Sequence, residues 1–389
     1  MKWLPFEYAV RNLGRSPIRL MAGILGSALV VLLVLAAGGF VRGMEKSLTV
    51  SGNDRNVMLL GAGSEESVER SQINQSVASL VIGGVPGIKQ RLGQYYVSPE
   101  VAMALVMKTA PDVKGDMQVI ARGFTPVAFL VHPQVRIIDG QPPRPGEYEV
   151  MVGKLAAVQL GVKDEDLAIG KSLWFDNRAW KITGHFAAPR TVMNAEVWVP
   201  LADLQIATRR DNSLSCVIVT LNQADFEDVQ AWAGQRLDLE LVAVRENDYY
   251  AGLFAFFGPV RAMIWVTAAL IALGGFFGGL NTMYAAFAAR VRELGTLRTL
   301  GFPPHAIMAS FLQESLLITA AGGCIAAAVA LLFIDGTAIR YSMGAFSLVM
   351  DERVLLGGLT AGAILAILGV IPPLWRCLRL PIFESLRAG

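Results

Sequence analysis

The stretch NTMYAAFAARVRELGTLRTLGFPPHAIMASFLQE, residues 281–314, contains a short basic segment between two long apolar ones. The basic segment is too polar to cross a bilayer and too short to form a domain. Arg290, Arg292 and Arg298 give it the positive charge expected of a cytoplasmic loop. Its glycines and prolines divide it into a brief helix and a turn. We call residues 290–305 the basic elbow.

One face of the elbow is apolar. On a helical projection Phe287, Val291 and Leu294 share one face, and Arg292 and Thr296 lie opposite. We therefore expect the elbow to lay an apolar stripe on a partner and to keep its charges in water. A plain loop that obeys the positive-inside rule is the alternative that the sequence leaves open.

The composition is that of a membrane protein with one soluble domain. Of the 389 residues, 53% are hydrophobic, which is too apolar for a soluble chain of this size. The net charge of +2 is nearly neutral, and the positive residues gather beside apolar runs, so no nucleic-acid partner is expected. Cys324 and Cys377 lie in or beside apolar runs, so no intrachain disulfide is expected.

Four predominantly apolar runs are long enough to cross about 30 Å of hydrocarbon as helices. The first is too long for the core of a cleaved signal peptide, which predicts an uncleaved signal anchor. Basic residues concentrate in three segments, which places both termini in the cytoplasm. The predicted layout is a cytoplasmic segment 1–19, spans 20–41, 259–289, 306–334 and 354–375, an outer domain 42–258, a cytoplasmic helix and loop 290–305, an outer loop 335–353 and a cytoplasmic tail 376–389.

Between the first two spans the sequence has charges of both signs, frequent glycine and proline, and strand-like runs. Strands are expected at 118–121, 149–152, 172–175, 180–185, 197–199 and 215–221, and helices near 154–160, 201–208 and 224–235. The predicted fold class is an α-helical integral membrane protein with four transmembrane helices and a large mixed α/β extracytoplasmic domain between helices 1 and 2.

Two features inside the spans are candidates for function. Gly274, Gly275, Gly278 and Gly279 form overlapping G-x-x-x-G pairs, where another helix can approach closely. The sequence leaves open whether that helix belongs to the same chain or to a second copy in a homodimer. Glu314 lies about two turns inside the third span, where a carboxylate facing lipid is costly. We expect it near the cytoplasmic membrane interface, paired with an elbow arginine; a proton relay is the less favoured alternative.

Enzymatic motifs are incomplete. Gly170, Lys171 and Ser172 match the end of a phosphate-binding loop, but Glu165 stands where that pattern requires glycine. The histidines lack metal-ligand spacing, and no nucleophile motif or carboxylate pair stands out. We expect no catalytic residue, no metal site and no cofactor in this chain.

Several segments resemble the FtsX/MacB-like permeases of ABC transporters. Outside the outer domain these are AVRNLGRSPIRL (9–20), RVRELGTLRTLGFPPHAI (290–307), FLQESLLITAAGG (311–323) and WRCLRLPIFESLRAG (375–389). In the outer domain they are VIARGF (119–124), DGQPPRPGEYEVMVGKLAAVQLGV (139–162), IGKSLWF (169–175), WKITGHF (180–186) and EVWVPLADL (196–204). The resemblance implies that the elbow is a coupling helix that docks on an ATPase. The coupling residues are then Arg290, Arg292, Glu293, Leu294, Gly295, Leu297, Arg298, Leu300 and Gly301.

The resemblance further implies a permease subunit of the mechanotransmission type in the bacterial inner membrane. ATP and Mg would bind a separate ABC ATPase subunit, and a substrate would be exported or released at the outer face. Expected partners are that ATPase, a second copy in a homodimer, a periplasmic adaptor with an outer-membrane channel, and membrane lipid. The alternatives are an FtsX-like scaffold that activates an extracytoplasmic cell-wall hydrolase and a membrane sensor partnered with a kinase. The sequence does not distinguish peptide, drug, lipid and lipoprotein substrates.

Overall fold

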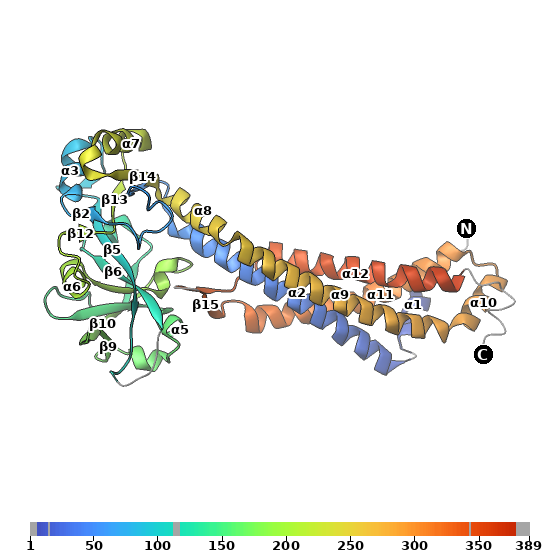
Figure 1. Ribbon diagram of the computed structural model, residues 1–389. Coiled ribbons are helices and arrows are strands. Elements are labelled where there is room, and N and C mark those ends of the chain that lie inside the picture. The colour runs from blue at the N-terminus through green and yellow to red at the C-terminus, as the bar shows by residue number, and fades with distance from the viewer. Residues whose placement is uncertain (1–5, 15, 112–116, 342–343, 379–389) are drawn as a thin grey trace. The chain divides into compact units, whose positions relative to one another are not determined.

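The computed structural model describes residues 6–14, 16–111, 117–341 and 344–378 (Figure 1). Lys2, Arg15 and the closing motif beyond Leu378 lie outside these residues. The chain divides into two units. The helical unit holds residues 1–42, 259–337 and 348–389, and the α/β unit holds residues 43–258 and 338–347.

The helical unit is built from α1 Phe6–Leu13, α2 Pro17–Ser51, α9 Gly258–Ala288, α10 Val291–Thr299, α11 Pro304–Val329 with a π-helical turn at Ala330–Ile334, and α12 Glu352–Leu378. Helices α2, α9, α11 and α12 are long and apolar enough to cross a membrane. Four such helices are what the apolar runs predict. Helix α2 continues ten residues past the predicted end of the first span, because a helix need not end where its apolar surface ends.

Glycine allows a close approach between two helices at a place that the sequence did not single out. A Cβ on Gly322 of α11 would lie 2.6 Å from the Ile24 carbonyl oxygen of α2, so the two backbones are nearly in contact. In the predicted strip on α9, a Cβ on Gly275 would meet Val30, but one on Gly274 would meet no atom of this chain within 4 Å, and the same is true of Gly278 and Gly279. Within the chain, only Gly275 makes the predicted close contact.

An ion pair joins the end of the membrane part of α2 to the start of α12. Arg42 Nε lies 2.7 Å from the Asp351 carboxylate, and both side chains are only 20% exposed. Asp351 also accepts a hydrogen bond from the Val354 backbone N–H at 3.2 Å, which begins α12. One carboxylate therefore both caps α12 and holds it beside α2.

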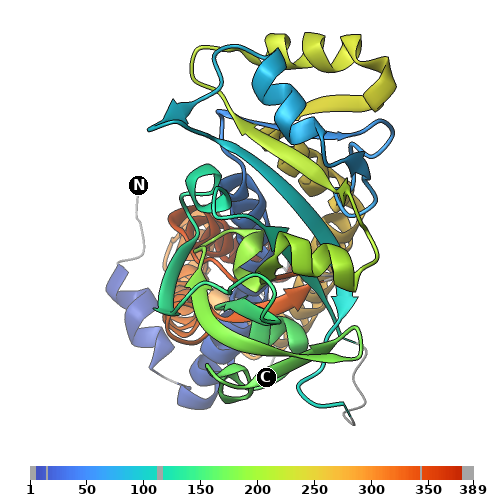
Figure 2. The same cartoon turned by 90° about the vertical axis from the view of Figure 1, so that its left-hand side faces the viewer.

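The α/β unit contains a ten-stranded mixed sheet in the order β14-β1-β13-β5-β6-β11-β8-β10-β7, with β9 paired to β10. Pairs β6/β11 and β8/β10 are parallel and the others antiparallel. Figure 2 shows the long strand β5 running through the unit. The strands are β1 Asn56–Gly61, β5 Val97–Val106, β6 Gln118–Phe124, β7 Arg136–Gly140, β8 Glu149–Gly153, β9 Ser172–Phe175, β10 Arg178–Ala187, β11 Val197–Pro200, β13 Cys216–Thr220 and β14 Leu241–Arg245.

Short elements complete this unit. The helices are α3 Val77–Gly84, α4 Ala128–Val131, α5 Ala156–Leu160, α6 Leu201–Ala207, α7 Phe226–Gln235 and α8 Glu246–Phe256, and the two-residue strands are β2 Ile73–Asn74, β3 Gln90–Arg91, β4 Gln94–Tyr95 and β12 Ser213–Leu214. The helices and strands expected between 118 and 235 are all present, so the mixed α/β prediction is confirmed.

The predicted outer loop 335–353 is partly a β-hairpin. Strands β15 Ala338–Tyr341 and β16 Gly344–Ser347 pair antiparallel. They belong to the α/β unit, although their flanking residues belong to the helical unit. The hairpin contacts α5 and the 3₁₀ turn Val192–Ala195, and the Tyr341 ring lies 5.1 Å from that of Phe257. The chain between α11 and α12 therefore enters the α/β unit and leaves it again.

Replacing Gly322 by Ala should lower the thermal stability of the full-length protein in detergent. The added methyl group meets α2 backbone, and overpacking of this kind costs about 1–3 kcal/mol. Gly278→Ala is the matched control, because its methyl group meets nothing within 4 Å. Equal melting temperatures for the two variants would contradict the close α2–α11 contact.

Candidate functional site: the basic elbow and the adjoining cavity

The ends of α10 are set by backbone chemistry. The Phe302 N–H donates to the Leu297 carbonyl at 3.2 Å, and the Gly301 N–H donates to the Arg298 carbonyl at 3.1 Å. Gly301 has φ +85, which a residue without a Cβ adopts readily. These bonds form a Schellman motif, which satisfies the last carbonyls and ends the helix. Helix α11 then begins at Pro304, a position that proline suits.

The apolar stripe of the elbow packs on the chain's own helices. Leu294 is 2% exposed and lies in one hydrophobic cluster with Phe287 of α9, Ile307 and Phe311 of α11, and Leu374 of α12. The expectation that Leu294 is presented to a partner is therefore wrong. A helical projection shows that a stripe exists but not what covers it.

The opposite side of α10 is exposed. The coupling residues predicted from the resemblance fall into three groups: Arg290, Leu294 and Gly295 are buried, Leu297 and Arg298 are half-buried, and Arg292, Glu293, Leu300 and Gly301 are exposed. Thr296 and Thr299 complete the exposed side. Leu300 is 60% exposed. We call Arg292, Glu293, Thr296, Thr299 and Leu300 the outer face of α10.

Glu314 pairs with an elbow arginine, as the sequence predicts. Arg290 Nη1 lies 3.2 Å from the Glu314 carboxylate, and the side chains are 10% and 13% exposed. The Arg290 guanidinium also lies 5.6 Å from the centre of the Phe311 ring. Pairing reduces the cost of holding a carboxylate on an apolar helix.

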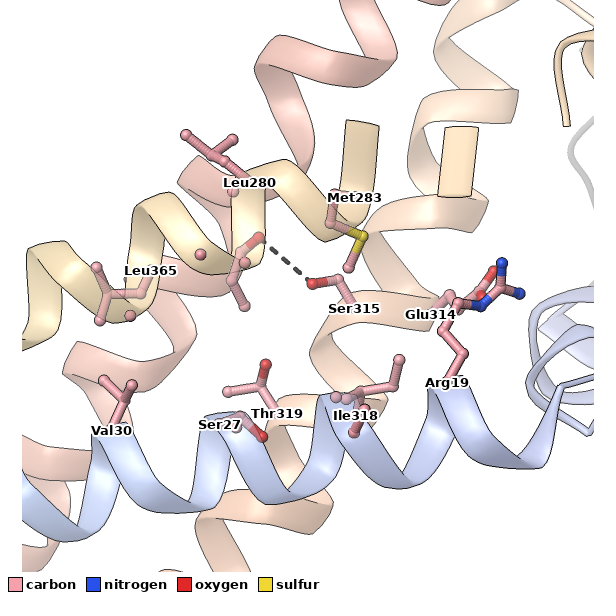
Figure 3. Close-up of a pocket in the computed structure, with 18 of the residues that line it drawn as sticks. Arg19, Ser27, Val30, Leu280, Met283, Glu314, Ser315, Ile318, Thr319 and Leu365 are labelled. Atoms are coloured by element: carbon pink, nitrogen blue, oxygen red, sulfur yellow. Dashed lines mark hydrogen bonds between the residues drawn. The ribbon is translucent and has the colours of Figure 1, made fainter. Parts of the chain in front are cut away.

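A cavity of about 470 Å³ lies among α2, α9, α11 and α12 beside this ion pair. Figure 3 shows Arg19 and Glu314 together at one end, with Val30 and Leu365 at the other. Gly275, Gly278 and Gly279 line it, together with Arg290. The predicted glycine strip and the predicted ion pair therefore meet at one hollow, which the sequence did not foresee.

A buried ionic network lies in the α/β unit, and sequence reasoning missed it. Arg122 of β6 donates to both Glu196 oxygens at 2.7 Å and to Glu100 of β5 at 2.6 Å. His132 Nε2 lies 2.9 Å from the other Glu100 oxygen. Glu246, the first residue of α8, accepts hydrogen bonds at 2.9 Å from the Asn53 backbone N–H and the Asn56 side-chain amide. The sequence signal that could have predicted this network is a single charged residue inside a strand-like run, such as Arg122 in VIARGF.

Charge pairing shifts the pKa values in this network. Burial would raise the pKa of Glu100, but His132 and Arg122 outweigh it and hold that pKa at about 2. Burial would lower the pKa of His132, but the Glu100 carboxylate raises it above 6.5. Burial raises the pKa of Glu246, and His132 and Asn56 offset this only in part. The network is therefore most stable with Glu100 ionised and His132 protonated.

Four helices able to cross a membrane, with an α/β domain inserted after the first, define the architecture of a multi-span membrane protein with one large domain outside the spans. Comparison with known proteins gives the family. The sequence profile of the MacB-like periplasmic core domain matches residues 20–235, and that of the FtsX-like permease C-terminal region matches residues 265–382. The chain therefore belongs to the MacB/FtsX-like permease family.

Individual relatives share little sequence identity with this chain. The macrolide export ATP-binding/permease protein MacB of Nitrobacter winogradskyi is 28% identical over 123 residues, which is 31% of this chain and 18% of that protein. The periplasmic region of MacB from Actinobacillus actinomycetemcomitans superposes with a TM-score of 0.38 at 10% identity, covering 51% of this chain and 92% of that one. A heavy metal efflux pump gives 0.17 at 14% identity, covering 84% and 36%.

Acid should destabilise the α/β unit through Glu100. Its folded pKa of about 2 lies below the ordinary value of 4.5, so its contribution is complete above pH 4.5 and is lost as the pH falls toward 2. Glu100→Gln should lower the free energy of unfolding by about 3–5 kcal/mol at neutral pH, because it breaks a buried pair. It should also flatten the dependence of stability on pH between pH 4.5 and 2.

The measurement is thermal unfolding of the full-length protein at a series of pH values, followed by tryptophan fluorescence. Trp198 is a local reporter, since its Nε1–H donates to Glu196. Asp211→Asn, at an exposed carboxylate, is the control and should follow the parent. An unchanged acid limb in Glu100→Gln would contradict the assignment.

Proposed function

We propose that this chain is the permease subunit of an ABC transporter of the mechanotransmission type. It couples ATP hydrolysis by a separate ATPase subunit to export or release of a substrate at the outer face of the bacterial inner membrane. The observation that supports this most is the two-sided character of α10. Leu294 anchors the helix to α9, α11 and α12, while its outer face is exposed and charged.

Such a helix can transmit a mechanical force from a partner to the rest of the chain. A force applied to the outer face reaches three apolar helices through one packed cluster. Helix α9 continues from α8, with a single residue between them, and α8 begins at Glu246 in the buried network. The chain thus offers a continuous route from α10 to the α/β unit, and a substrate handled at the outer face need not pass between the helices.

The remaining partners follow from the same proposal. ATP and Mg bind the partner ATPase, and both termini lie in the cytoplasm. Gly274 is the strip residue that neither lines the cavity nor meets a neighbour within 4 Å, which suits a seam with a second copy. The name of the Nitrobacter winogradskyi relative, a macrolide export protein, favours efflux. A periplasmic adaptor and an outer-membrane channel remain part of the proposal as partners that the family resemblance implies.

Reporter fusions test the topology. Reporters placed after Met44 and Asp335 should be extracytoplasmic, and those after Arg298 and Arg387 should be cytoplasmic, because basic residues are retained inside. A cytoplasmic signal from Asp335 would rule out four spans in this arrangement.

Reversing the character of the outer face should uncouple the ATPase. We expect Arg292→Glu combined with Leu300→Asp to leave melting temperature and membrane insertion unchanged, because both side chains are exposed. Loss of an interface anchor typically costs 2 kcal/mol or more, so complex formation with the ATPase should weaken by about 30-fold or more. Copurification yield and ATP turnover are the measurements.

Two comparison variants make this test specific. Arg91→Glu with Leu92→Asp makes the same two changes at exposed positions of the α/β unit and should couple normally. Leu294→Ala should instead destabilise the fold by about 2–5 kcal/mol, because its side chain is buried within the chain. An outer-face variant that binds and stimulates the ATPase like the parent would mean that α10 is not the docking helix.

A further inference from the structure

The cavity beside the elbow owes its shape to missing side chains. Gly26 of α2 and Gly278 and Gly279 of α9 all line it, and a Cβ on any of them would meet no atom within 4 Å. Glycines on two facing helices thus leave a hollow of about 470 Å³, within the roughly 300–1,000 Å³ typical of ligand sites.

The walls of the hollow present mostly apolar surface. Two wall hydroxyls are engaged by their own bundle: Ser27 donates to the Ile24 carbonyl at 3.0 Å, and Ser315 donates to the Ala366 carbonyl at 3.4 Å. Apart from Thr319, the other lining side chains between the glycines are aliphatic or aromatic, such as Val30, Ile318 and Leu365. An occupant of this part is therefore expected to be mostly apolar.

The other end of the hollow is charged, with a positive excess. Arg19 and Glu314 lie there together (Figure 3). Arg290, which pairs with Glu314, also lines the hollow, and Glu314 is the single carboxylate among the described lining residues. Two guanidinium groups against one carboxylate favour an anion, and arginine matches phosphate oxygens in a bidentate way. An apolar hollow ending in excess arginine is complementary to a molecule with a tail and an anionic head.

We propose that the cavity binds an anionic phospholipid, with one acyl chain in the glycine-lined part and the headgroup phosphate at Arg19 and Arg290. The source is the surrounding membrane, because α2, α9, α11 and α12 are the four helices able to cross it. Leu29 lines the hollow and is 59% exposed, so the hollow opens at the side of the bundle. Basic pockets between membrane helices are known to suit such headgroups.

Native mass spectrometry of the full-length protein tests this directly. Delipidated protein in detergent is titrated with phosphatidylglycerol and, separately, with phosphatidylcholine of the same acyl chains. The parent should retain phosphatidylglycerol preferentially, and Arg19→Gln should remove most of that preference. Gly26→Leu should lower retention of both lipids by about tenfold or more, since excluding two methylenes already has that effect.

The controls separate filling of the cavity from damage to the fold. Gly357→Leu adds the same side chain on α12 at a site that also meets nothing within 4 Å and does not line the hollow, and it should bind lipid like the parent. Gly278→Leu fills the hollow from α9 and should repeat the Gly26→Leu result. If neither filled variant folds, the proposal is still tested by whether Arg19→Gln loses the preference for phosphatidylglycerol over phosphatidylcholine.

Three results would overturn the proposal. The first is equal retention of the two lipids by the parent. The second is undiminished phosphatidylglycerol retention by both filled variants. The third is a parent dimer that excludes lipid, with binding recovered only in monomers, which would make a second copy of the chain the occupant. None of these results depends on the ATPase, so they are distinct from failure of the coupling proposal.

Discussion

The carboxylate of Glu246 joins the two places where the chain enters and leaves the main part of the α/β unit. Glu246 is fully buried and begins α8, while its donors Asn53 and Asn56 follow directly after α2. A buried carboxylate is tolerated only when it is hydrogen-bonded, so the end of α2 and the start of α8 cannot separate without a large cost. Through His132, 3.8 Å away, the same carboxylate adjoins Glu100 and Arg122 in the centre of the sheet. The entry points and the core of this unit are therefore one electrostatic network.

The chain passes between the two units more than once. Four chain connections join the two units, near residues 42, 258, 337 and 347. The last two flank the β15–β16 hairpin, which packs on α5 of the α/β unit. The α/β unit is therefore built from two separate segments of the chain.

The sequence predicts best where one physical term dominates. Long uncharged runs have no stable alternative to spanning helices, and alternating runs near Trp180 and Val197 form the expected strands. Strand β5 was missed because Pro99 and Glu100 interrupt its pattern, although Glu100 is buried by its pairing with Arg122. Spacing shows which residues share a face but not what lies opposite. For this reason neither the close α2–α11 contact at Gly322 nor the packing of Leu294 within its own chain was predicted.

Arg290 belongs to both candidate sites, the basic elbow and the cavity beside it. It precedes the first residue of α10, forms the ion pair with Glu314 and lines the cavity. A phosphate at the cavity end would share this guanidinium with the Glu314 carboxylate. A ligand can bias an equilibrium only through a difference in affinity between two states. Arg290 is the residue from which α10 starts. If α10 tilts when an ATPase closes, a lipid headgroup that contacts Arg290 would bind the two positions of α10 with different affinities. An acyl chain in the glycine-lined part of the cavity would make no contact with Arg290 and would supply affinity without that preference.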